Sequence, residues 1–124
     1  MNEKKTLRQH RLLFICLGNI CRSPAAEGVM KALASAAGRS ADFHIDSAGI
    51  GDWHVGQLPD IRMRRRGALR GYNFDSAARQ IRRSDFKDFD LLLVMDASNF
   101  TTVGGMATSP EEREKVVMLT DFLT

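Results

Sequence analysis

Two short apolar runs mark the chain, one at 12–17 and one within 90–96. Each is closed at once by turn-forming or charged residues, which is typical of strands buried on both faces of a parallel sheet. A third segment, 43–48, alternates apolar and polar positions, and 115–119 is a further short apolar segment. The pattern therefore predicts four strands.

Helical periodicity separates these strands. Ser23-Pro24 reads as an N-cap followed by a proline in the first turn. Gly38 supplies the stop of this first helix, and its apolar positions recur at spacings of three and four: Ala26, Val29, Met30, Leu33 and Ala37. Further helices are predicted over 59–70 and over 97–105. Strands that alternate with helices predict an α/β fold, an open parallel four-stranded sheet flanked by helices.

Length and composition place this fold in one domain. The chain has 124 residues, of which 44% are hydrophobic and 27% charged, as in an ordinary globular protein. Residues 1–10 are polar and are expected to form a flexible tail, so the domain is predicted over 11–124. We find no stretch with the length and apolarity of a membrane span or a signal peptide, so we expect no membrane partner and a cytoplasmic location.

The net charge of +3 comes with a cluster of basic residues in the second predicted helix: Arg62, Arg64, Arg65, Arg66 and Arg70. Such a cluster could bind phosphate groups or nucleic acid. However, apolar residues recur at helical spacing on another side of the same helix, at Ile61, Ala68, Leu69 and Tyr72. The pattern favours a solvated helix face, and no nucleic-acid partner is expected.

The candidate chemistry lies where the first strand ends. Cys16 and Arg22 have the spacing Cys-x5-Arg, and Ser23 follows directly. Gly18 and Asn19 tolerate the backbone conformations that turn successive N–H groups toward an anion. The start of the helix favours negative charge at the same place, and Arg22 can grip two phosphate oxygens. Cys16 is therefore expected to ionise readily and to attack a bound oxyanion, with the Ser23 hydroxyl hydrogen-bonded to the thiolate.

Two other interpretations of the cysteines are weaker. Cys16 and Cys21 could be small buried apolar residues. A zinc site would need the scattered histidines His10, His44 and His54, and the cysteine spacing does not match zinc ligands. We therefore expect no metal and no cofactor. Because both cysteines lie on one loop, oxidation is expected to link them reversibly.

The stretch at 14–26, FICLGNICRSPAA, resembles the phosphate-binding loop of the low-molecular-weight protein-tyrosine phosphatases. The similarity extends over nearly the whole chain after the tail. It continues through Asp46-Ser47-Ala48-Gly49, Gly51-Asp52-Trp53-His54-Val55-Gly56, Ala78-Arg79-Gln80, Ser84-Asp85-Phe86, and Met95-Asp96 with Asn99. The resemblance implies a Rossmann-like or flavodoxin-like phosphatase fold.

The resemblance also implies a role for each residue of the loop. Cys16 would form a phosphocysteine intermediate, and Arg22 would bind the phosphoryl group and stabilise the transition state. Asn19 and Ser23 would brace the loop, and Trp53 would form a wall beside the phenyl ring of the substrate. The backbone amides that cradle the phosphate would come from Leu17, Gly18, Asn19, Ile20, Cys21 and Arg22. Asp96 and Asn99 would be structural.

This chain departs from the family pattern at two places. Many members have a histidine that supports the loop shortly before Ala78-Arg79-Gln80, and 75–78 contains none. The family's general acid is an aspartate that follows the last strand, and 120–124 holds no matching segment. We expect the chain to be truncated, with the acid beyond Thr124 and the C-terminal helix absent.

The expected function is hydrolysis of phosphotyrosine or small aryl phosphates, with tyrosine-phosphorylated proteins as partners. Arsenate reduction on the same fold would need more cysteines than the two present. A protein-arginine phosphatase is closer, but relatives with that activity carry a threonine at the position of Ile20. A phosphate-binding protein without catalysis, lacking its general acid, is the non-enzymatic alternative.

Overall fold

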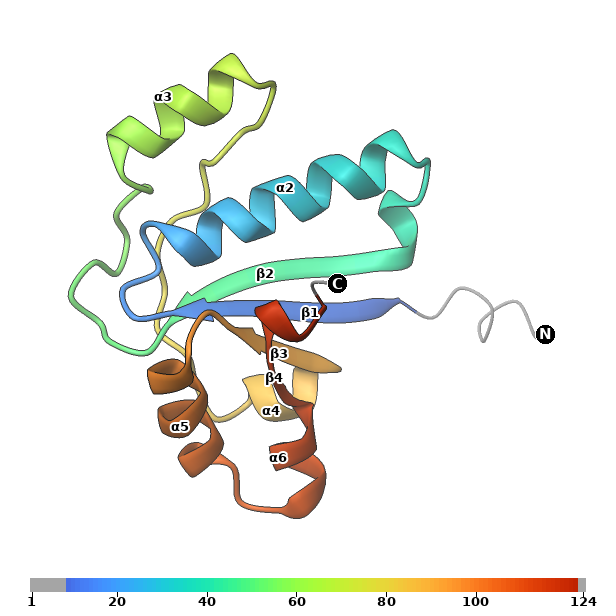
Figure 1. The fold of residues 1–124 in the computed structure, drawn as a ribbon, viewed down its shortest axis with the longest axis vertical. Helices are drawn as coiled ribbons and strands as arrows, with labels where there is room; N and C mark the ends of the chain where they lie inside the picture. Colours follow the sequence, from blue (N-terminus) through green and yellow to red (C-terminus); the bar gives the residue numbers. More distant parts are fainter. Residues whose placement is uncertain (1–8, 123–124) are drawn as a thin grey trace.

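The computed structural model describes residues 9–122, and four parallel strands form its single sheet (Figure 1). These are β1 (His10–Cys16), β2 (Phe43–Gly49), β3 (Leu91–Val94) and β4 (Val116–Met118), in the order β2-β1-β3-β4. All three neighbouring pairs are parallel. The predicted fold class and the four predicted strands are confirmed. Of the expected tail, residues 1–8 lie outside the described part of the chain, and His10 already belongs to β1.

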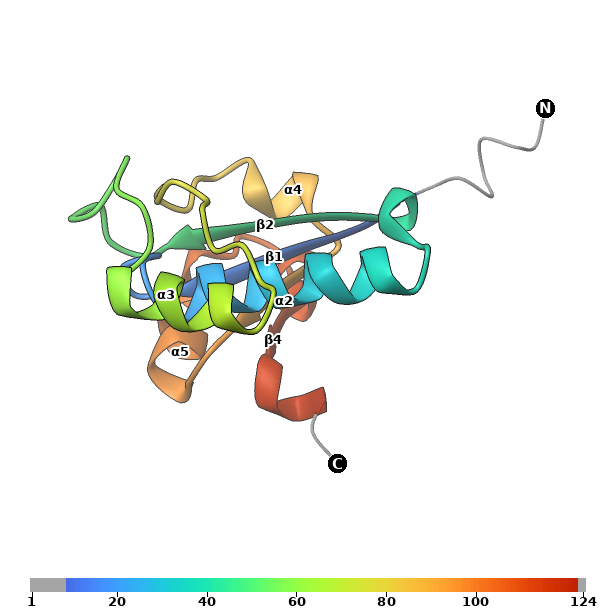
Figure 2. The same cartoon turned by 90° about the horizontal axis from the view of Figure 1, so that it is seen from above.

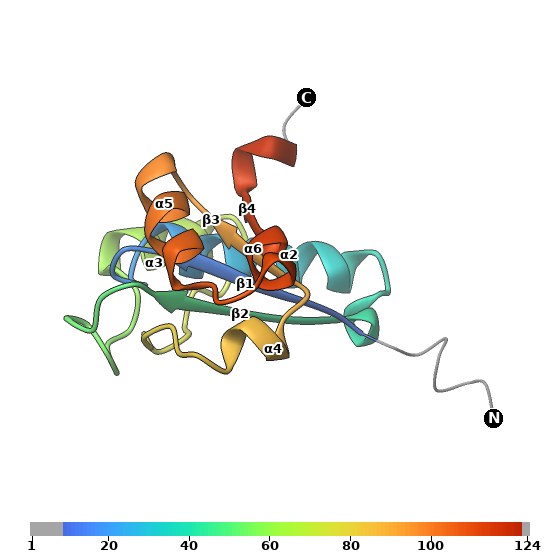
Figure 3. The ribbon, with the colours of Figure 1, turned by 90° about the horizontal axis from the view of Figure 1, so that it is seen from below.

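The helices are α2 (Arg22–Ala36), α3 (Ile61–Leu69), α4 (Asp85–Asp88), α5 (Ala97–Met106) and α6 (Pro110–Lys115). Two 3₁₀ turns complete the described chain, η1 (Ser40–Asp42) and η2 (Leu119–Phe122). Figures 2 and 3 show α2 and α4 on opposite sides of the sheet. No helix among residues 9–122 has the length and apolar character needed to cross a bilayer.

Alternation along β1 explains the two layers of the core. Leu13 and Ile15 point to one face, where they pack with Phe86 of α4 and Val103 of α5. Phe14 points to the other face, where Ala26 and Met30 of α2 pack against the sheet. A central strand buried on both faces has the uninterrupted apolar sequence that predicted it.

Phe74, which follows α3, holds α2 and α3 together. Its ring lies against Gly28 of α2 and Gly67 of α3, where an added Cβ would come within 2.4 Å of the ring on either side. Tyr72 stacks on Phe74 with the ring centroids 5.8 Å apart. Two glycines therefore let the helices approach one aromatic ring closely, and this contact fixes α3 beside α2.

The structure corrects the predicted N-cap of α2 and the predicted buried positions of α2 and α3. Ser23 does not cap α2, because the helix begins at Arg22 and the Ser23 hydroxyl is bound elsewhere. The expected apolar stripe included Leu33, which is 57% exposed, whereas Glu27 of the same helix is buried. In α3 the predicted apolar positions Ile61 and Leu69 are exposed, since the helix packs through Gly67 instead.

Candidate active site

The segment that joins β1 to α2 lies at the carboxyl end of a central strand. We call it the Cys16 loop; it comprises residues 16–22 and so includes the last residue of β1 and the first residue of α2. Ligands of open α/β sheets bind at this edge. Asn19 has a φ of 57°, a left-handed conformation that asparagine adopts more readily than most residues. Its backbone N–H donates to the Cys16 sulfur at 3.3 Å. The loop thus curls back over the thiol.

The end of β2 supports the loop from below. A Cβ added to Gly49 would lie 3.0 Å from the carbonyl carbon of Gly18 and 3.1 Å from the Asn19 nitrogen. Beyond it, the N–H groups of Ile50 and Gly51 donate to the carbonyls of Cys16 and Leu17 at 3.0 and 2.9 Å. A glycine at position 49 therefore lets the loop lie this close to β2 without a shift of the loop backbone.

A chain of buried hydrogen bonds leads away from the thiol. Cys16 Sγ and Ser23 Oγ lie 3.0 Å apart, and the Asn19 side-chain amide donates to Ser23 Oγ at 2.8 Å. The same amide nitrogen donates to Ser47 Oγ at 2.9 Å, and Ser47 Oγ lies 2.5 Å from a carboxylate oxygen of Glu27. All five side chains are at most 4% exposed.

Glu27 ends this chain of bonds and is fully partnered. Its second oxygen accepts from Lys31 Nζ at 2.6 Å and from Ser76 Oγ at 2.8 Å. Ser76 lies in the segment 75–78, where the family resemblance leads us to expect a supporting histidine. In this chain a serine hydroxyl and a lysine therefore satisfy the buried carboxylate.

The direction of each hydrogen bond follows from the groups at the two ends. The Glu27 carboxylate can only accept, so the Ser47 hydroxyl donates to it and its oxygen accepts from Asn19. The two hydrogens of the Asn19 amide are then used by Ser47 and Ser23. The Ser23 hydroxyl proton is left free to point at the Cys16 sulfur.

Arg79 fixes the orientation of Asn19. Its backbone N–H donates to Asn19 Oδ1 at 2.9 Å, which sets the amide oxygen and nitrogen in place. Its guanidinium binds Asp46 at 3.0 Å and the fully buried Asp85 at 3.0 and 3.1 Å. Burial alone would lower the pKa of Arg79, but the hydrogen bond to Asp85 and the charges of both aspartates outweigh it and raise that pKa.

Arg22 lies at the mouth of the loop. Its side chain is 51% exposed and forms an ion pair with Asp96, with Nη2 3.0 Å from the carboxylate oxygen. Asp96 also accepts from the N–H of Asn99 at 2.8 Å and so caps α5. The hydrogen bonds from the Asn99 backbone and from Arg22 hold the pKa of Asp96 below its usual range.

The remaining predicted site residues form an exposed rim. Leu17 is 53% and Trp53 64% exposed, Cys21 is exposed, and Ile20 is half-buried. The Trp53 ring covers Gly51, the glycine whose N–H binds the loop. The structure thus divides the predicted residues into a buried group around Cys16 and an exposed group at the mouth.

Three supporting residues were missed by the sequence analysis: Glu27, Ser47 and Arg79. Ser47 and Arg79 lie in segments that carry the family resemblance, but no sequence pattern around either residue indicates that it supports the loop. Glu27 does carry a signal, because a charged residue there interrupts a run of small and apolar residues on α2.

Within residues 9–122 no three His, Cys, Asp or Glu side chains are grouped so that they could hold a metal ion. The histidines are engaged separately: His10 lies against Phe43, His44 stacks on Phe89, and His54 contacts Gln57. The predicted absence of a metal stays a prediction.

Nearly the whole chain matches a known protein family. The family model for low molecular weight phosphotyrosine protein phosphatase matches residues 11–124. The chain belongs to this family. The resemblance inferred from the loop is confirmed.

Relatives of this phosphatase family cover most of the chain. A putative low molecular weight protein-tyrosine-phosphatase of Synechocystis is 45% identical over 112 residues, which are 90% of this chain and 71% of that protein. The chain spans 63% and 62% of the length of relatives from Drosophila melanogaster and Bacillus subtilis.

Solved phosphatase structures share the fold. A product-state mimic of a protein tyrosine phosphatase from Entamoeba histolytica superposes with a TM-score of 0.90 at 42% identity, covering 94% of this chain and 74% of that one. The crystal structure of a Drosophila arginine phosphatase superposes with a TM-score of 0.83 at 35% identity, covering 89% and 71% of the two chains.

Proposed function

We propose that this chain hydrolyses phosphotyrosine and other aryl phosphate monoesters through a phosphocysteine intermediate on Cys16. One observation carries the proposal. The Cys16 sulfur is buried at the base of the loop, with the Asn19 N–H at 3.3 Å and the Ser23 hydroxyl at 3.0 Å. Family membership supports the same chemistry.

In the first step the Cys16 thiolate attacks phosphorus and the bond from phosphorus to the phenolic oxygen breaks. The electron pair of that bond leaves with the phenolic oxygen, which takes up a proton from water. Arg22 can pair with two of the phosphoryl oxygens, and the N-terminus of α2 adds its positive end. To grip the phosphate, the Arg22 guanidinium shares or exchanges its contact with Asp96.

In the second step water attacks the phosphorus of phosphocysteine. The sulfur–phosphorus bond breaks, inorganic phosphate forms, and the electron pair returns to Cys16 as a thiolate. The Ser23 hydroxyl stabilises the departing sulfur, because the hydrogen-bond chain from Glu27 leaves its proton free for that purpose. Both steps use residues of the described chain for charge stabilisation.

The exposed rim favours an aryl substrate. Trp53 offers an aromatic face, and Ile20 and Leu17 offer apolar surface at the mouth of the loop. A phosphorylated guanidinium would find no polar partner on Ile20, and a polar group left without a partner binds weakly. The likeness to an arginine phosphatase keeps phosphoarginine as the second candidate substrate. Cytoplasmic action on tyrosine-phosphorylated proteins stays a prediction.

Turnover of p-nitrophenyl phosphate, phosphotyrosine and phosphoarginine by the wild type tests the proposal. We expect the aryl phosphates to be hydrolysed and a phosphoenzyme to be trapped at Cys16 by rapid acid quench. Binding of phosphate without turnover of any substrate would favour the non-enzymatic alternative. Faster turnover of phosphoarginine than of phosphotyrosine would favour the arginine phosphatase.

A further inference from the structure

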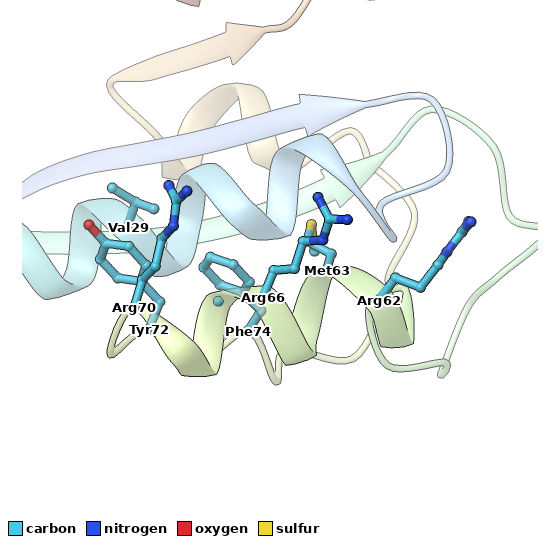
Figure 4. A pocket seen from close by; sticks show the side chains of 8 residues that line it. Val29, Arg62, Met63, Arg66, Arg70, Tyr72 and Phe74 are labelled. Carbon is cyan, nitrogen blue, oxygen red and sulfur yellow. The ribbon is translucent and has the colours of Figure 1, made fainter.

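A groove of about 610 Å³ lies between α2 and α3 (Figure 4). Its floor is apolar and comes from both helices and from the segment after α3, through Val29, Met63 and Phe74. One side is lined by Arg62, Arg66 and Arg70 of α3 and its C-cap. The groove therefore combines an apolar floor with a basic edge.

The three arginines follow one another at intervals of four residues, which places them on one face of the helix. At a rise of 1.5 Å per residue they span about 12 Å. Within residues 9–122, neither Arg66 nor Arg70 has an acidic side chain within ion-pair distance. Arg62 forms an ion pair with Asp60, at 3.4 Å, and its side chain is 85% exposed. Within the described residues, the basic edge thus has no acidic partner at Arg66 and Arg70, and only Arg62 is paired.

The groove begins beside the Cys16 loop. The N–H of Asp60, the residue that caps α3, donates to the carbonyl of Ile20 at 2.8 Å. Figure 4 shows Arg62 at the end of α3 that lies toward this loop, with Arg66 and then Arg70 farther along. A polypeptide held at Cys16 could continue directly into the groove.

We propose that this groove binds an acidic segment of the protein substrate, next to the phosphotyrosine held at Cys16. The proposal rests on the proposed phosphatase function. Carboxylates of the segment pair with Arg66 and Arg70, since guanidinium binds carboxylate through two parallel hydrogen bonds. One apolar side chain of the segment lies on Val29 and Phe74. A span of about 12 Å matches about four residues of extended chain.

The short span and the apolar floor favour a peptide over nucleic acid. Nucleic-acid binding relies on many phosphate contacts spread over a wide basic surface. Here the basic edge holds three arginines, and the floor beneath them suits a side chain.

Peptide kinetics test the proposal. Phosphotyrosine peptides carry a block of Asp and Glu on either side of the phosphotyrosine, and matched peptides carry Asn and Gln instead. We expect one acidic series to show a KM about five- to tenfold lower at unchanged kcat, because exposed charge pairs are individually weak. The double variant Arg66→Gln/Arg70→Gln should lose this preference, and 1 M salt should reduce it in the wild type.

Arg65→Gln is the matched control. Arg65 lies on the same helix and carries the same charge, but it does not line the groove. This variant should keep the acidic preference, and every variant should keep wild-type turnover of p-nitrophenyl phosphate. If Arg65→Gln and the double variant lose the preference for acidic peptides equally, the preference is a general charge effect, and the proposal that the groove binds them is wrong.

The outcomes separate the groove from the catalytic proposal. If the protein hydrolyses p-nitrophenyl phosphate but shows no preference for acidic peptides, the proposal for the groove is wrong and the proposed phosphatase function stands. If turnover is absent, fluorescence anisotropy with the same peptides still measures whether Arg66 and Arg70 bind the acidic block. Stronger inhibition by a single-stranded oligonucleotide in the wild type than in the double variant would assign the groove to nucleic acid instead.

Discussion

The inner side and the rim of the Cys16 loop differ in how firmly the structure fixes them. On the inner side Cys16, Asn19 and Ser23 are at most 4% exposed, and hydrogen bonds join all three. At the rim Leu17 and Trp53 are more than half exposed. Hydrogen bonds among the loop, α2, β2 and the chain before α4 hold the inner side in a single arrangement. The rim consists of exposed side chains.

This difference separates two tasks of the site. Groups aimed in advance at the reacting atoms stabilise charge without reorganising during the reaction, so they belong on the rigid inner side. Substrate selection needs only contact area and polarity, which exposed side chains provide. We therefore expect inner-side substitutions to act on kcat for every substrate, and rim substitutions to change the ratio between substrates.

Cys16→Ser is the severest test of the inner side. We expect turnover of all substrates to fall by about 10⁴-fold or more, the scale found when a covalent nucleophile is removed. An alcohol stays protonated near neutral pH and is a poor nucleophile there. Inorganic phosphate should still bind, because the backbone amides, the helix and Arg22 remain. Calorimetry with phosphate and turnover assays measure the two effects separately.

Oxidation should produce a loss as deep as that of Cys16→Ser, but a reversible one. Cys16 is buried on the inner side of the loop, whereas Cys21 is exposed at the rim. We expect peroxide to form a disulfide between them with release of water, and dithiothreitol to restore activity. Cys21→Ser should lose the recovery while keeping the initial rate. Inactivation of the wild type that dithiothreitol fails to reverse would contradict the prediction.

Arg22→Lys tests the residue that lies between the two regions. We expect kcat to fall by about 10²–10³-fold, the usual effect of removing one aimed donor from a charged transition state. A lysine keeps the charge near Asp96 but cannot reproduce the planar two-pronged grip. Asp96→Asn is the control, because it keeps the guanidinium and removes only its partner, so its effect should be smaller. An unaffected Arg22→Lys variant would remove Arg22 from the catalytic role.

Glu27→Gln reaches the thiol only through other residues and tests the hydrogen-bond chain. A glutamine amide can donate to Ser47, which would reverse the Ser47 hydroxyl and disturb Asn19 and Ser23. Hydrogen bonds to charged groups contribute about 1.5–3 kcal/mol, so kcat should fall by about ten- to a hundredfold.

Ser76→Ala is the comparison for Glu27→Gln. It removes one partner of the carboxylate but leaves the direction of every bond toward Cys16 unchanged. It should therefore lower the free energy of unfolding while changing kcat less than Glu27→Gln does. An equal loss of kcat in both variants would mean that Glu27 acts through packing alone.

The strands and the reactive loop were predictable because each is a local feature of the sequence. Cys16 and Arg22 belong to one short loop, so their spacing is visible without a fold. The apolar runs that form β1 and β3 owe their composition to burial on both faces. By contrast α4 and α6 have only four and six residues, too few for periodicity to be recognised.

The support of the loop was not predictable, because it is assembled from distant segments. Ser47 and Arg79 contact Asn19, and Glu27 contacts Ser47, only after α2, β2 and the chain before α4 pack around the loop. Helical periodicity also misled the interpretation of α2, since Ser23 and Glu27 occupy buried positions that a pattern of apolar residues assigns to the surface. Polar residues become buried here because each finds a partner, which a sequence pattern does not show.

Ile20→Thr is the gentlest test, and it addresses the rim. The side chain of Ile20 is half-buried beside Gly18, while its carbonyl accepts from Asp60 whatever the side chain is. The substitution should therefore leave the loop in place, remove apolar surface from the mouth and offer a guanidinium a hydroxyl partner. Changes of this size alter discrimination by about 1–3 kcal/mol, so we expect the ratio of kcat/KM for phosphoarginine to that for phosphotyrosine to rise about tenfold. Ile20→Val is the control, because it loses a methylene without gaining a polar group, and its ratio should stay at the wild-type value. If Ile20→Val and Ile20→Thr change the ratio equally, packing at the mouth selects the substrate. If both variants lower kcat equally for every substrate, Ile20 belongs to the inner side, and the division of the site into two regions is wrong.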